Sequence, residues 1–227
     1  MLKAKFVHTK LPLSLKELSS LMIENQFSDD TGKGFILSSS AAERLSGQYI
    51  EKINELLILT DPFGNTTEVE SVSYYACKYS WVNDSSFLTL IEPPRSLKKF
   101  ANALHDLTGL GLVLSETNLE LKSWLQRIEE RVDQLTITKV AVSGIKASDF
   151  SLAKLSIMGS KDVRESMSKM LNDRFHILDS VVFTAEFDGL DFRCELSKTG
   201  SFKVFSINTQ RVISILKESL DSSSSYH

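Results

Sequence analysis

Cysteine is scarce in this chain: Cys77 and Cys194 are the only two among its 227 residues. They lie far apart, each inside an alternating, strand-like pattern, whereas a secreted disulfide framework shows several cysteines at close spacing. We therefore expect both thiols to be reduced and buried, in a cytosolic protein.

Long apolar runs are also missing. A membrane-spanning helix needs about 18 to 20 consecutive apolar residues, and no stretch of the chain approaches that length. The opening segment, MLKAKFVHTKLPLSLKELSS, has no uninterrupted apolar region of the kind a signal peptide requires. The sequence therefore predicts no membrane segment and a cytoplasmic location.

Recognisable catalytic motifs are absent. The histidines are scattered and have no cysteine partner at metal-ligand spacing, so we do not expect a zinc site. Gly32-Lys33-Gly34 lacks the spacing of a phosphate-binding loop, and we interpret it as a plain turn. We expect a protein that is not an enzyme and has no cofactor and no metal; an active site assembled from distant residues, which would leave no local motif, is the third alternative.

Charged side chains alternate along one predicted strand. Asp191, Arg193 and Glu195 share a face, and Lys198 follows them. A metal-dependent nuclease needs acids that converge from separate strands beside a lysine. Because the apolar residues Phe192, Cys194 and Leu196 make the opposite face the buried one, we interpret the charged face as solvated.

The two halves of the chain differ in charge. The formal net charge is -3, which argues against a simple polycation. Residues 1–130 carry 13 Lys and Arg against 17 Asp and Glu, a balance of -4, and residues 131–217 carry 13 against 10, a balance of +3. The C-terminal half is therefore mildly basic.

Hydrophobic periodicity predicts an α+β protein of two mixed αβ domains, each a mostly antiparallel sheet with packed helices. Ser14 and Glu17 form a capping box that begins a first helix. ELLILT followed by DPFGN indicates a strand that ends in a turn. We place an N-terminal αβ domain at 1–130, a C-terminal αβ domain with the order β-β-α-β-β-β-α at 131–221, and a polar tail at 222–227.

One helix start carries an unusual basic cluster. Ser96 can cap a helix over 97–107, and Arg95, Lys98 and Lys99 crowd its first turn. The dipole of a helix favours negative charge at this end, so cations here are placed against that preference. Basic side chains beside the free backbone N–H groups of the first helical turn can together bind an anion. The alternative interpretation is that these side chains are simply solvated at the start of the helix.

The order of elements after residue 132 carries a resemblance. Two strands are followed by Gly159-Ser160-Lys161-Asp162-Val163, a helix, a long strand, a turn, a strand, a turn and a last strand. This layout resembles the central part of RdgC, the recombination-associated DNA-binding proteins, and is similar to that of the phage exclusion protein RexA. It covers about a third of the chain and concerns order and spacing.

The resemblance implies a non-enzymatic, sequence-independent duplex DNA-binding protein of bacterial or phage origin that acts as a homodimer, in recombination or phage defence. Binding to the DNA backbone needs several Lys and Arg contacts. We expect these to come from seven residues: Arg95, Lys98, Lys99, Lys146, Lys154, Lys161 and Arg164. The alternative is a protein-binding regulatory or immunity-type partner subunit that contacts another protein through an exposed strand or a Met-containing helix face.

Overall fold

The computed structural model describes residues 1–41, 43–172 and 174–221, so the expected tail at 222–227 lies outside the described residues. Within the described residues, strands make up 49% and helices 23% of the structure. The prediction of two helix-packed αβ domains is therefore wrong, because one antiparallel network of eleven strands dominates the chain.

Hydrogen bonds link the strands in the order β2-β3-β4-β5-β1-β11-β10-β9-β7-β8, and β6 pairs with β1. The first strand pairs with the last one, Leu2 opposite Val204 and Lys5 opposite Ser201. Local periodicity predicts strands but not such distant partners, and this is why the expected separation into two sheets fails. The strands are β1 Leu2–Lys10, β2 Lys33–Ala41, β3 Arg44–Thr60, β4 Thr66–Val82, β5 Phe87–Ile91, β6 Val113–Ser115, β7 Gln134–Ser148, β8 Ser151–Met158, β9 Ile177–Phe187, β10 Leu190–Ser197 and β11 Ser201–Phe205.

Five helices accompany the strands in the described residues: α1 Leu15–Glu24, α2 Lys98–Thr108, α3 Leu121–Glu129, α4 Arg164–Leu171 and α5 Thr209–Asp221. The capping box of α1 is confirmed, because the Ser14 hydroxyl accepts a hydrogen bond from the Glu17 N–H and the Glu17 carboxylate accepts one from the Ser14 N–H. Helix α2 begins at Lys98 with Leu97 as its N-cap, and Ser96 accepts the Lys98 N–H from just outside the helix.

The chain divides into two compact units. Unit 1 consists of Met1–His8 and the chain from Ser115 onwards, and unit 2 is Thr9–Leu114. Strand β1 contributes to both units, because its last two residues belong to unit 2. The two units differ in their bounds from the expected domains at 1–130 and 131–221. The division into those domains stays a prediction.

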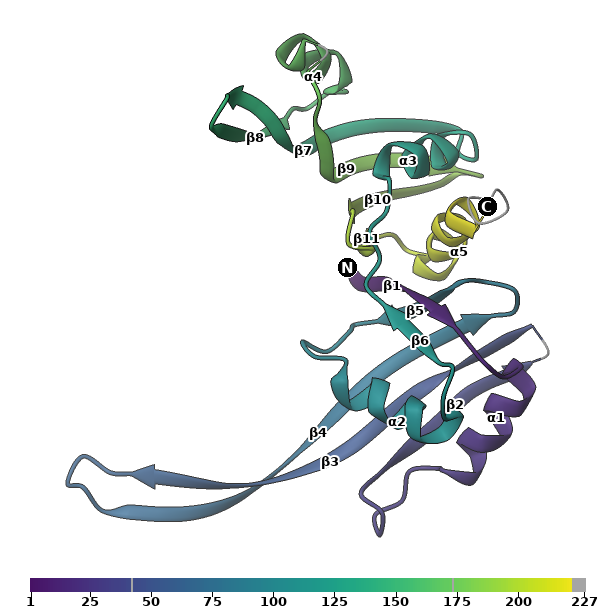
Figure 1. The fold of residues 1–227 in the computed structure, drawn as a ribbon, viewed down its shortest axis with the longest axis vertical. Coiled ribbons are helices and arrows are strands. Elements are labelled where there is room, and N and C mark those ends of the chain that lie inside the picture. The colour runs from purple at the N-terminus through teal and green to yellow at the C-terminus, as the bar shows by residue number, and fades with distance from the viewer. Residues whose placement is uncertain (42, 173, 222–227) are drawn as a thin grey trace. The chain divides into compact units, whose positions relative to one another are not determined.

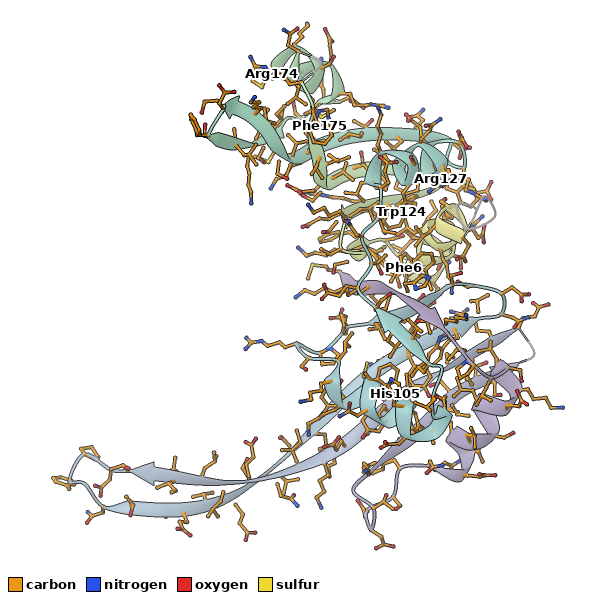
Figure 2. The ribbon with its side chains drawn as sticks, in the orientation of Figure 1. Phe6, His105, Trp124, Arg127, Arg174 and Phe175 are labelled. Atoms are coloured by element: carbon orange, nitrogen blue, oxygen red, sulfur yellow. The ribbon has the colours of Figure 1, made fainter. Side chains whose placement is uncertain are left out.

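In unit 1, helices α3 and α5 cover one face of the sheet (Figure 1). Phe6 of β1 packs between Trp124 of α3 and Phe202 of β11, with ring centroids 6.0 and 4.6 Å away (Figure 2). The indole N–H of Trp124 donates to the carbonyl of Leu216 on α5 at 3.0 Å. The hydrogen bond satisfies the buried indole donor inside the core.

In unit 2, helices α1 and α2 cover one face of the β2-β3-β4-β5 sheet (Figure 1). Phe100 of α2 is 1% exposed and stacks on Tyr79 with ring centroids 5.4 Å apart. Trp81 lies beside the same ring, and the Tyr79 hydroxyl donates to the sulfur of Met22 on α1 at 3.2 Å. Aromatic packing therefore holds both helices on this face.

Strands β3 and β4 form a hairpin that extends beyond the rest of this sheet (Figure 1). Each strand has 17 residues, and their register runs from Arg44 opposite Val82 to Thr60 opposite Thr66. Pairing with β2 ends at Glu51, and β4 pairs with β5 only at residues 78–80. We call residues 53–73 the arm.

Replacing Phe100 by Ala should lower the free energy of unfolding by about 3–5 kcal/mol, because it removes a fully buried ring that three aromatic side chains surround. Urea unfolding followed by tryptophan fluorescence measures the change. Lys98→Ala, an exposed position two residues earlier in the same helix, is the control. A decrease below about 1 kcal/mol would contradict this packing.

Candidate functional site

The basic cluster at the start of α2 is only partly available. Arg95 and Lys98 are exposed, but the Lys99 ammonium contacts the Glu51 carboxylate at 2.6 Å. The Tyr49 hydroxyl donates to the same carboxylate at 3.0 Å. The hydrogen bond from Lys99, more than any other contact, holds the pKa of Glu51 below its usual range. Lys99 therefore joins α2 to β3.

Four of the seven predicted DNA-binding residues lie in unit 1, and two of these are in ion pairs. Lys146 pairs with Asp149 at 2.8 Å. Arg164 pairs with Asp162 and with Glu129 of α3, at 2.9 and 2.7 Å. These carboxylates raise the pKa of Arg164 above its already high value. Lys154 and Lys161 are exposed.

Asp162 holds Arg164 in place. Burial raises the pKa of Asp162, but hydrogen bonds from Arg164 and from the backbone N–H of Ile137 outweigh this effect, so the pKa lies below its usual range. The Glu129 contact ties the start of α4 to α3. Arg164 is thus part of the scaffold of unit 1, and the seven predicted residues divide between the two units, three in unit 2 and four in unit 1.

The face of the unit 1 sheet opposite α3 and α5 carries charged side chains that stand in rows across neighbouring strands. Strand alternation puts Phe192, Cys194 and Leu196 in the core and turns Asp191, Arg193 and Glu195 outward. We call this surface the open face, because most of its side chains in the described part of the chain are exposed or half-buried.

Basic residues concentrate at the β1–β11–β10 side of the open face. Lys3 on β1 stands directly opposite Lys203 on β11, and Lys203 stands opposite Glu195 on β10. The Lys203 ammonium contacts the Glu195 carboxylate at 3.0 Å. The remaining basic residues of this face are Lys5 on β1, Lys139 on β7, Lys154 on β8 and Arg193 on β10.

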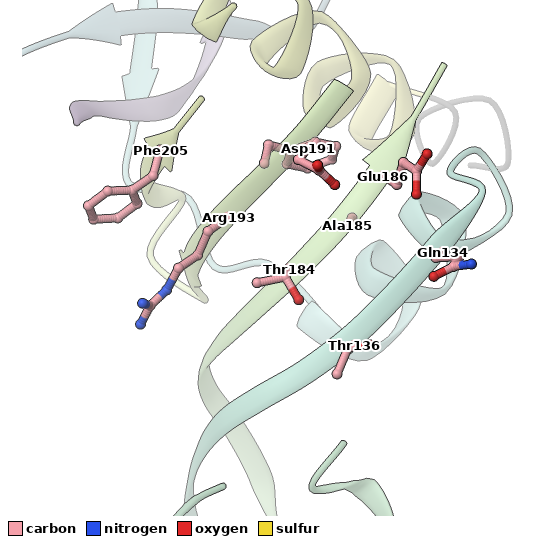
Figure 3. Close-up of a pocket in the computed structure, with 9 residues that line it drawn as sticks. Gln134, Thr136, Thr184, Ala185, Glu186, Asp191, Arg193 and Phe205 are labelled. Carbon is pink, nitrogen blue, oxygen red and sulfur yellow. The ribbon is translucent and has the colours of Figure 1, made fainter. Parts of the chain in front are cut away.

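A shallow hollow of about 430 Å³ lies on the open face. Arg193, Thr184 and Thr136 point to the same side from three adjacent strands (Figure 3). The Arg193 guanidinium lies 5.8 Å from the ring centre of Phe205. The hollow is lined by Gln134, Thr136, Thr184, Ala185, Glu186, Asp191, Phe192, Arg193 and Phe205.

The two ends of this hollow differ in charge. Asp191 and Glu186 are opposite each other in the register of β10 and β9, so one end is acidic. Arg193 marks the other end, which continues into the basic row with Lys203 and Lys3. No group of three or more His, Cys, Asp or Glu residues in the described part of the chain is arranged to hold a metal ion. The basic side can bind an anion.

Sequence reasoning missed most of this surface. The alternation of Lys3 and Lys5 with buried Ala4 and Phe6 signals a strand with one basic face, and the outward position of Arg193 follows from the pattern of β10. The missing information was that β1 pairs with β11, which puts basic residues 200 positions apart in one row.

Both cysteines are free and buried, as the sequence predicts. Burial raises the pKa of the Cys77 thiol to about 12 and also raises that of Cys194 above its usual value. A thiol that stays protonated is a poor nucleophile, so neither side chain offers nucleophilic chemistry at neutral pH.

No family model matches the chain, and the search of curated proteins finds no match either. The resemblance to RdgC and RexA therefore stays a prediction. None of the described helices is long and apolar enough to cross a membrane.

The ion pair of Lys99 leads to a pH-dependent prediction. A carboxylate whose pKa is lower in the folded chain than in the unfolded one stabilises the fold above the unfolded value, about 4.3 for Glu. This stabilisation disappears as the pH falls through the lower, folded value of Glu51. Lys99→Met should therefore destabilise the protein slightly at pH 7, by less than about 1 kcal/mol, and less at pH 3, which lies below the unfolded value.

Urea unfolding at the two pH values measures this difference, and Lys98→Met is the matched control. An equal decrease at both pH values would show that Lys99 acts through packing of its aliphatic chain and not through Glu51.

Proposed function

We propose that the protein binds duplex DNA through its backbone phosphates, without sequence preference and without catalysis, and that the open face of unit 1 makes the contact. The observation that carries this proposal is the basic row on β1, β11 and β10. Like charges directly opposite each other on adjacent strands, such as Lys3 and Lys203, destabilise a sheet. Glu195 pairs with Lys203 and balances one of these charges, and a bound phosphate adds further negative charge to the row.

The dimensions of the open face fit several phosphates. Neighbouring strands lie about 4.8 Å apart, so the strands from β1 to β7 in the order β1-β11-β10-β9-β7 span roughly 19 Å. Along the helix axis of duplex DNA, each strand carries one phosphate about every 3.4 Å. Lys and Arg supply the charge, and the hydroxyls of Thr136 and Thr184 supply further donors of the kind that contact phosphates.

Duplex DNA is the better ligand because the open face offers little for base stacking. Single-stranded nucleic acid binds largely by stacking its bases on aromatic side chains. Phe205 is the exposed aromatic residue of the hollow, at 40% exposure, and Arg193 already lies over its ring. Phosphate contacts therefore supply most of the binding.

A protein-binding role is the second candidate, and the exposed apolar arm favours it.

The double substitution Arg193→Glu with Lys203→Glu should weaken binding to random-sequence duplex DNA at least about tenfold at low salt, equally for all sequences, because it removes two cations that bind phosphates and adds repulsion. The slope of log K against log salt should also become shallower by about 0.9 for each phosphate that the variant no longer neutralises. Fluorescence anisotropy at several salt concentrations measures both quantities.

The matched control is Arg95→Glu with Lys98→Glu, which makes the same charge change at exposed positions of unit 2. The control should bind DNA as the unchanged protein does. Weaker binding by the control alone would move the site to the start of α2, and no binding by the unchanged protein at low salt would overturn the function.

A further inference from the structure

The arm exposes an apolar surface that the rest of unit 2 does not cover. The exposed fractions of its aliphatic side chains reach 63% at Ile58, and Phe63 at the turn is 90% exposed. The arm strands pair only with each other in the described chain, and an isolated two-stranded hairpin is marginally stable in water. Its exposed apolar residues are Leu56, Leu57, Ile58, Leu59, Phe63, Val69 and Val72.

One face of the arm continues the core of unit 2. The register places Leu57 and Val69 on the same side of the hairpin as Tyr49, Cys77 and Tyr79, which are buried beneath the helices. The side of the sheet that the helices cover therefore continues along the arm, beyond the point where α1 and α2 end (Figure 1). An apolar patch of this kind marks an interaction site.

Hydrogen bonds to one carboxylate order the turn at the end of the arm. The Asp61 carboxylate accepts hydrogen bonds from the backbone N–H groups of Phe63 and Asn65 and from the Asn65 side chain, each at 2.9 Å. The side-chain hydrogen bond from Asn65 is the largest cause that lowers the pKa of Asp61. These bonds define the backbone of the turn that carries the exposed Phe63, and an ordered backbone gives up less freedom on binding.

The arm is strongly acidic. Residues 53–73 contain four carboxylates, on Glu55, Asp61, Glu68 and Glu70, and no Lys, Arg or His. Glu68 and Glu70 stand directly opposite Ile58 and Leu56 in the register, on the face of the hairpin that alternation turns away from Leu57 and Val69. A surface that covers the face with Leu56 and Ile58 must therefore be apolar and must carry positive charge.

The end of unit 1 around β7 and β8 has these properties. Leu152, Lys154 and Met158 are exposed and alternate with the partly buried residues of β8. Phe175 and Ile177 lie next to Gly144 of β7, and Phe150 in the turn is fully exposed. We call the apolar residues Phe150, Leu152, Met158, Phe175 and Ile177, together with the bases Lys154 and Arg174, the tip. Asp149 balances the charge of the neighbouring Lys146.

We propose that the arm of one copy of this chain packs against the tip of a second copy. Each surface provides what the other needs, because both expose large apolar side chains and their charges are opposite. Contact between two arms would bring eight carboxylates together, and contact between two tips would bring bases together. Like charges that meet in an interface are strongly unfavourable, so arm against tip is the favoured pairing.

The contact joins two different surfaces and is therefore heterologous, so that the copies either close into a ring or continue into a longer assembly. Lys154 belongs to both the tip and the open face, but Arg193 and Lys203 lie on other strands. The arm variant and the Arg193 and Lys203 variant therefore test the two proposals at different residues, and each proposal can fail without the other.

Charge reversal tests the pairing. Glu68→Lys with Glu70→Lys reverses the arm, and Lys154→Glu with Arg174→Glu reverses the tip; all four side chains are exposed. Sedimentation velocity of the full chain at increasing concentration should show association that weakens with salt for the unchanged protein. Each variant alone should associate at least about tenfold more weakly. An equimolar mixture of the two variants should regain association, because a reversed arm then meets a reversed tip.

The matched control, Asp29→Lys with Asp30→Lys, makes the same charge change in the exposed loop before β2 and should associate as the unchanged protein does. Three outcomes would overturn the proposal: an unchanged protein that stays monomeric, a tip variant that associates normally, or a mixture that gains nothing over the separate variants. Circular dichroism of each variant confirms that it is folded.

Discussion

The pairing of β1 with β11 is the contact on which the rest of the structure depends. It joins the beginning of the chain to its last strand and places Phe6 against Trp124 and Phe202 in the core of unit 1. The last residues of β1 belong to unit 2, where the Thr9 N–H donates to the Ser86 carbonyl at 2.8 Å. Closing contacts between segments this far apart costs loop entropy, and burial of these aromatic rings offsets it.

Each sheet buries one face, and the candidate sites arise from what this leaves uncovered. In unit 1, α3 and α5 pack on the apolar face, and alternation along the strands turns the charged residues to the other side. In unit 2, α1 and α2 cover the buried face of β3 and β4 only as far as the region of Tyr49 and Tyr75. The same face then continues along the arm with Leu57 and Val69 exposed.

Local features were predictable because local physics determines them. The capping box at Ser14, the turn after ELLILT and the outward charges of β10 all follow from residue types at short spacing. The ion pairs of Lys99 and Arg164 were not predictable, because the partners Glu51 and Glu129 lie 48 and 35 positions away. The basic row on the open face likewise required the register of β1 with β11, which no local pattern contains.

The net charge of the chain does not decide whether it binds DNA. Four of its carboxylates lie on the arm without a neighbouring base in sequence, whereas Lys3, Lys203 and Arg193 gather on adjacent strands of the open face. At physiological ionic strength charges are screened beyond about 8 Å. A phosphate on the open face therefore responds to the side chains beside it, and the separation of acidic and basic residues matters more than their sum.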